Sequence, residues 1–65
     1  MYLKNLIELR KQKGWTQERL AIESGISYNT LIKIERNGIK NPKIETVIKL
    51  ADALEVSLDD LVGRK

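Results

Sequence analysis

The sequence predicts an all-α fold, a compact bundle of five short helices, and three observations lead to this expectation. Apolar residues recur at spacings of three and four, and there is no sustained strand alternation. Glycine and proline divide the chain into pieces of helical length. The length of 65 residues fits one small domain over residues 1–65, with a core too small for a large stability margin.

The first helix is expected over about residues 2–13. One face repeats at helical spacing and carries Leu3, Leu6, Ile7 and Arg10. Gly14 follows directly and is suited to the left-handed conformation that commonly ends a helix. The first helix therefore places a single arginine on an otherwise apolar face.

The second and third helices are predicted from their capping residues. Thr16 is a good N-cap for a helix that stops at Gly25, and Ser27 is an N-cap for a helix that ends near residues 37–38. Two short helices joined by a turn of about three to four residues containing glycine form a helix-turn-helix. We expect this motif over about residues 16–37.

The last two helices follow the single proline. Pro42 is suited to the first position of the fourth helix. That helix has a regular apolar stripe made of Ile44, Val47, Ile48, Ala51 and Leu54. Ser57, with Asp60 three residues later, is close to a capping box and predicts the start of the fifth helix.

The composition excludes several classes of function. The chain has no Cys and no His, so the usual metal ligands and the commonest general base are absent. We therefore expect no metal, no cofactor and no enzymatic activity. No run of roughly 18 apolar residues predicts a membrane span, and the N-terminal residues do not resemble a signal peptide. A cytoplasmic location is expected.

The charge is unevenly distributed along the chain. The net charge of +3 is ordinary for a small domain, but residues 1–43 carry a net +5 and residues 44–65 a net −2. A basic first part suggests a polyanionic partner, although charge alone does not decide this.

A helical wheel of the third helix separates two faces. Leu31 and Ile34 share the face expected to be buried, whereas Asn29, Lys33 and Arg36 lie on the opposite face. Asn can pair with adenine, and Lys can donate to guanine. Any surface helix carries polar residues outward, so the position of this helix after a short capped helix and a glycine turn is what favours DNA binding.

A resemblance to a known family covers nearly the whole chain. The stretch from Thr16 to Gly38 is TQERLAIESGISYNTLIKIERNG, and the similarity continues through Pro42 and residues 44–54 and 56–61. This pattern resembles the phage-repressor/Cro family of helix-turn-helix transcriptional regulators, also called the xenobiotic-response-element type. The resemblance implies the lambda-repressor-like fold, with the third helix in the major groove of DNA.

The resemblance also implies roles for individual residues. The positions expected to contact bases or nearby phosphates are Ser27, Tyr28, Asn29 and Lys33. The positions expected to contact phosphates are Gln17, Asn37, Lys40 and Lys43, to which the wheel adds Arg36. Arg10 and Glu35 are implied to form a partly buried ion pair between the first and third helices.

Two residues depart from the family pattern. Tyr28 stands where many members have Gln, and a phenol cannot make the bidentate adenine contact of an amide. Contact with DNA and packing on its neighbours both remain open for Tyr28. Ile32 stands where many members are polar. Both departures bear on which operator is bound.

The sequence therefore predicts a sequence-specific DNA-binding transcriptional regulator, a repressor, of prokaryotic or phage origin and associated with the nucleoid. A homodimer on double-stranded DNA is expected, with half-sites about 34 Å apart. The candidate dimer contacts are Val56, Leu58, Leu61 and Val62. The alternative is a protein-interaction module, or an antitoxin-like regulatory partner, that uses the same fold to bind another protein.

Overall fold

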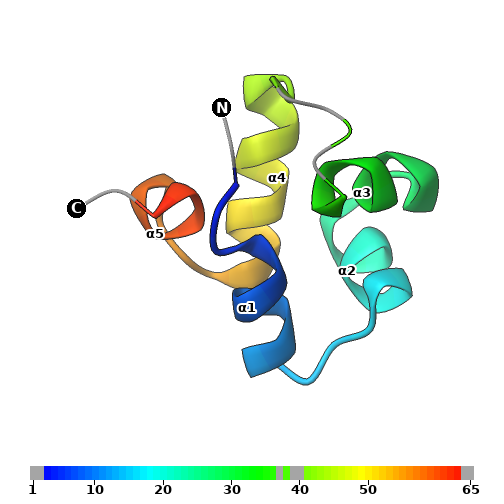
Figure 1. The fold of residues 1–65 in the computed structure, drawn as a ribbon. Coiled ribbons are helices and arrows are strands. Elements are labelled where there is room, and N and C mark those ends of the chain that lie inside the picture. The colour runs from blue at the N-terminus through cyan, green and yellow to red at the C-terminus, as the bar shows by residue number, and fades with distance from the viewer. Residues whose placement is uncertain (1–2, 37, 39–40, 64–65) are drawn as a thin grey trace.

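A computed structural model of the chain describes residues 3–36, 38 and 41–63. In these ranges it contains five helices and no strand (Figure 1): α1 (Leu6–Gln12), α2 (Gln17–Ser24), α3 (Tyr28–Glu35), α4 (Ile44–Leu54) and α5 (Leu58–Val62). The predicted all-α, five-helix fold is confirmed. No helix in these ranges has the length and apolar content needed to cross a membrane.

α4 is the central element of the bundle. It contacts α5 on one side and α2 on the other, while α2 also packs against α3 and α1 against α5 (Figure 1). All five helices contribute to the set of fully buried side chains, which are Leu6, Leu20, Leu31, Val47, Leu50 and Leu61. Burying each such side chain contributes about 1.5–3 kcal/mol, so this small core depends on every helix.

α1 is shorter than the sequence predicted. The expected helix over residues 2–13 begins only at Leu6, because Asn5 is bonded to α5 instead. The Asn5 N–H donates to the Leu61 carbonyl at 3.1 Å, and the Asn5 Nδ2 donates to the Asp60 carbonyl at 2.8 Å. This attachment turns the chain so that Leu3, outside the helix, is buried in the core.

Three helices begin at the hydroxyl caps that the sequence predicted. The side-chain oxygens of Thr16, Ser27 and Ser57 each accept a hydrogen bond from the backbone N–H three residues later. α4 differs, because its N-cap is Lys43 in an extended conformation and Pro42 precedes it. The prediction that Pro42 occupies the first helical position is therefore wrong by two residues.

The turn between α2 and α3 depends on Gly25. Its φ of 73° lies in the left-handed region, which costs glycine little. The Ile26 N–H then donates to the Ala21 carbonyl at 3.2 Å, which closes the end of α2 and directs the chain into Ser27. This turn fixes the relative orientation of the two helices of the motif.

α4 ends in the same way, but without a glycine. Glu55 adopts φ 58° and ψ 41°, and the Val56 N–H donates to the Ala51 carbonyl at 3.0 Å. A side chain in the left-handed region is strained by roughly 1–2 kcal/mol. The Glu55 carboxylate accepts a hydrogen bond from Lys13 Nζ at 3.0 Å, but this side chain is 80% exposed, and exposed ion pairs stabilise little.

The variant Glu55→Gly is therefore expected to raise the free energy of unfolding. The relief of strain outweighs the lost ion pair and the added freedom of the unfolded chain, for a net gain of about 0.5–1 kcal/mol. Urea denaturation followed by the fluorescence of Trp15, the single tryptophan, measures the change. Glu55→Ala, which loses the ion pair and keeps the strain, is the matched control and should show no gain. Equal stability of the two variants would contradict the prediction.

Candidate nucleic-acid interface

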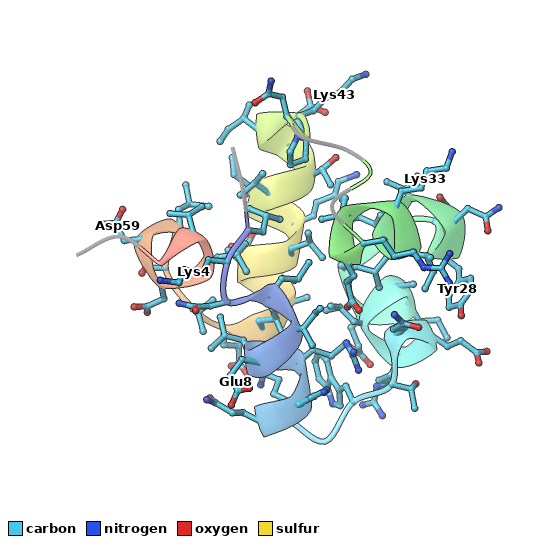
Figure 2. All side chains as sticks on the ribbon, in the orientation of Figure 1. Lys4, Glu8, Tyr28, Lys33, Lys43 and Asp59 are labelled. Atoms are coloured by element: carbon cyan, nitrogen blue, oxygen red, sulfur yellow. The ribbon has the colours of Figure 1, made fainter. Side chains whose placement is uncertain are left out.

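α3 presents two different faces. Leu31 and Ile34 are buried against the rest of the bundle, whereas Asn29, Lys33 and Arg36 are exposed. The wheel therefore assigned the two faces correctly. In the described part of the chain, the side chains of Asn29 and Lys33 form no hydrogen bond or ion pair, so the side-chain amide and ammonium are available to a ligand. Figure 2 shows Tyr28 and Lys33 projecting from α3 on the side away from α5.

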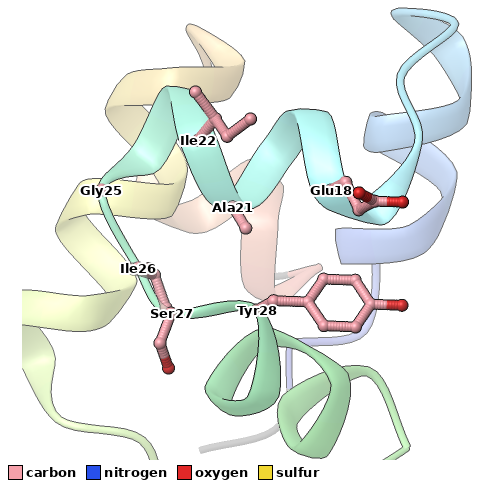
Figure 3. A pocket seen from close by; sticks show the side chains of 7 residues that line it. All are labelled: Glu18, Ala21, Ile22, Gly25, Ile26, Ser27 and Tyr28. Carbon is pink, nitrogen blue, oxygen red and sulfur yellow. The ribbon is translucent and has the colours of Figure 1, made fainter.

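Tyr28 lies at the edge of this face. Its side chain is 46% exposed and borders an open hollow of about 660 Å³ between α2 and the start of α3. Figure 3 shows the ring lying alongside α2 and pointing toward the end that carries Glu18, with Ile22 on the same hollow. The ring is thus partly packed beside α2, while a large part of it remains accessible.

Ser27 has a local structural role as the N-cap of α3. Its hydroxyl oxygen accepts a hydrogen bond from the Thr30 N–H at 3.2 Å, and the hydroxyl donates to Thr30 Oγ1 at 2.8 Å. Its donor is therefore already used within the protein. Ser27 is nevertheless exposed, so its side chain stays accessible at the start of the α3 face.

Arg10 and Glu35 form an ion pair between α1 and the end of α3. Arg10 Nε donates to Glu35 Oε2 at 2.8 Å, and Nη2 donates to Oε1 at 3.3 Å. The two side chains are only 11% and 3% exposed. The remaining guanidinium nitrogen, Nη1, donates to the Trp15 carbonyl at 2.9 Å. The pair thus connects α1, the chain entering α2, and α3.

Gln17 is the third member of this network. Its Nε2 donates to Glu35 Oε1 at 2.8 Å, and the residue is half-buried at the start of α2. The sequence predicted a phosphate contact for Gln17 and did not predict this bond. Gln17 and Glu35 are 18 residues apart on different helices, so no periodicity in the sequence indicates their contact.

Lys43, another basic residue of the prediction, lies at the start of α4. Lys43, the N-cap residue, is exposed and forms no side-chain capping bond. A hollow of about 380 Å³ beside it is lined from both α3 and α4, by residues that include Thr30 and Thr46. Asn37 and Lys40, predicted to contact phosphates, lie outside the described residues.

A family model described as helix-turn-helix matches residues 6–61 of the chain. The chain belongs to the Cro/C1-type helix-turn-helix family. The resemblance inferred from the residues between Thr16 and Gly38 is therefore confirmed. The relatives of this chain include transcriptional regulators.

Individual relatives agree with this assignment. The chain is 44% identical over 52 residues to the HTH-type transcriptional regulator SlrR of Bacillus subtilis, covering 80% of this chain and 34% of SlrR. It is 44% identical over 59 residues to the cryptic phage CTXphi transcriptional repressor RstR of Vibrio cholerae, covering 91% of this chain and 52% of RstR. The chain thus spans between a third and about half the length of these two relatives.

A solved structure, a complex of the SinR and SinI proteins, has the same fold. It matches with a TM-score of 0.88 and 34% sequence identity, over 95% of this chain and 60% of the matched chain. The arrangement of helices described above is therefore that of a solved helix-turn-helix protein.

The contributions of Arg10 and Glu35 to the free energy of unfolding should be strongly coupled. Arg10→Met or Glu35→Leu alone should cost roughly 3–5 kcal/mol, because each leaves one buried charge without its partner. The double variant should be more stable than either single variant. Denaturant titration of the four proteins gives the coupling energy. A loss in the double variant equal to the sum of the two single losses would show that the pair is not coupled.

Proposed function

We propose that this chain is a sequence-specific DNA-binding transcriptional regulator that inserts α3 into the major groove. The observation that carries the proposal is the exposed α3 face, where Asn29 and Lys33 are available for base edges and Arg36 for a phosphate. The position of this face in a helix-turn-helix supports the same docking mode.

The roles of the individual residues follow from their positions. The residues proposed to contact bases or adjacent phosphates are Ser27, Tyr28, Asn29 and Lys33. The residues proposed to contact phosphates are Gln17, Arg36, Asn37, Lys40 and Lys43. Gln17 and Lys43 lie at the N-terminal ends of α2 and α4, where the helix dipole favours an anion.

We propose repression as the regulatory outcome, supported by the similarity to the phage repressor RstR. Two copies would bind half-sites about 34 Å apart, since a two-fold symmetric dimer requires a near-palindromic site. Of the predicted dimer contacts, Leu61 is fully buried within the chain, whereas Leu58 is 39% exposed and remains available. The working location would be the cytoplasm of a prokaryotic cell, at the nucleoid.

A second candidate is binding to another protein. The similarity to SinR in a complex with SinI supports it, as do the exposed apolar residues Ile44 and Ile48 on α4. A pull-down that captures a stoichiometric protein partner, from a chain that selects no DNA sequence, would favour this alternative over DNA binding.

Selection from random DNA should enrich one sequence family. The double variant Asn29→Ala/Lys33→Ala should then lose affinity for that sequence by at least about tenfold, because each good base contact contributes about 1–3 kcal/mol. Lys4→Ala is the control, since Lys4 lies beside α5, on the opposite side of α4 from Lys33 (Figure 2). A pool without enrichment, together with unchanged binding by the double variant, would reject the proposal.

Lys43→Ala should weaken binding to all DNA sequences to a similar degree. A phosphate contact carries no base information, and its loss should reduce the slope of log K against log salt by about 0.9. Fluorescence anisotropy over a salt series measures the slope. An unchanged slope, equal to that of the Lys4→Ala control, would remove Lys43 from the interface.

A further inference from the structure

Gln17 differs from an ordinary surface glutamine in that its amide is fixed by a buried group. Nε2 donates to Glu35 Oε1 at 2.8 Å, and the Glu35 side chain is only 3% exposed. A surface glutamine normally samples several rotamers, and it loses this conformational freedom when it binds a ligand. The Gln17 side chain is already held at the start of α2 before any DNA is present.

The acceptor of this bond is itself held on both oxygens. Arg10 Nε donates to Oε2 and Arg10 Nη2 to Oε1, so the carboxylate cannot rotate without breaking bonds to a charged group. Arg10 Nη1 also holds the Trp15 carbonyl, directly before the N-cap of α2. One guanidinium thus fixes the backbone that enters α2 and, through Glu35, the first side chain of α2.

The arrangement leaves Gln17 with a free donor in a suitable place. An amide nitrogen carries two N–H groups, of which one is used on Glu35. The second lies at the N-terminal end of an eight-residue helix, where the dipole attracts a phosphate. The positive charge of Arg10 balances the Glu35 carboxylate behind the amide, so this carboxylate repels the phosphate less.

We infer that Arg10 and Glu35 are positioning residues for DNA binding, which act by holding the Gln17 amide in the orientation that meets a phosphate. This inference rests on the proposed function and deepens it. Ordering one flexible side chain at an interface lowers affinity by about two- to tenfold, and the Arg10–Glu35 pair removes that loss in advance.

A thermodynamic cycle on DNA affinity tests the inference. The four proteins are the unchanged chain, Gln17→Ala, Arg10→Met/Glu35→Leu, and the triple variant. In the unchanged background, Gln17→Ala should weaken binding to a mixed-sequence DNA duplex by at least about threefold. In the Arg10→Met/Glu35→Leu background the same change should have a clearly smaller effect, because the amide is no longer held.

A merely structural role for the ion pair predicts a different result. Gln17→Ala would then weaken binding by the same factor in both backgrounds, and this outcome overturns the inference. Gln12→Ala removes an exposed amide from α1 and is the matched control, expected to have no effect in either background. Failure of the unchanged chain to bind any duplex would instead reject the proposed function.

A measurement on the unchanged chain keeps the inference testable if the double variant does not fold. The side-chain amide of Gln17 should have a high NMR order parameter, near the value of about 0.85 typical of a rigid backbone. The amide of Gln12 should fall below about 0.6, as in a flexible segment. Equal mobility of the two amides in the free protein overturns the inference.

Discussion

The buried ion pair between Arg10 and Glu35 is the constraint on which the rest of this structure depends. A charge removed from water requires a partner with good geometry, and here the guanidinium bonds to the carboxylate at 2.8 and 3.3 Å. Such a pair need not stabilise the fold more than an apolar pair would. It does fix α1 and α3 in one register, because any other arrangement leaves a charge unpaired. In the described residues, no buried side-chain nitrogen or oxygen lacks a hydrogen-bond partner.

The sequence predicted the fold well because the fold is determined by local signals. The hydroxyls of Thr16, Ser27 and Ser57 and the left-handed Gly25 set the helix ends within a few residues. The late start of α1 was missed because a distant contact decides the local structure, since Asn5 bonds to α5. The left-handed conformation of Glu55 after α4 is a feature that no propensity predicts.

The candidate site was predictable from the sequence only in part, in contrast to the fold. A helical wheel suffices to place Asn29, Lys33 and Arg36 on one exposed face, since the helix period alone determines it. The bond between Gln17 and Glu35 was not predictable, because it depends on how α2 and α3 pack against each other. The family resemblance supplied the Arg10–Glu35 pair but not this third member.

The exposed residues of α3 differ in how closely they are tied to the scaffold. The side chains of Asn29 and Lys33 are exposed and bond to no other described residue, so changing them alters the surface and not the core. Tyr28 also lies against the hollow beside α2, so a change there alters both the surface and the packing between α2 and α3. Gln17 is tied still more closely, since its partner is the buried carboxylate that connects α1 to α3. The reading of bases can therefore vary with little effect on the fold, whereas the phosphate contact proposed for Gln17 is built into the interaction that holds the helices together.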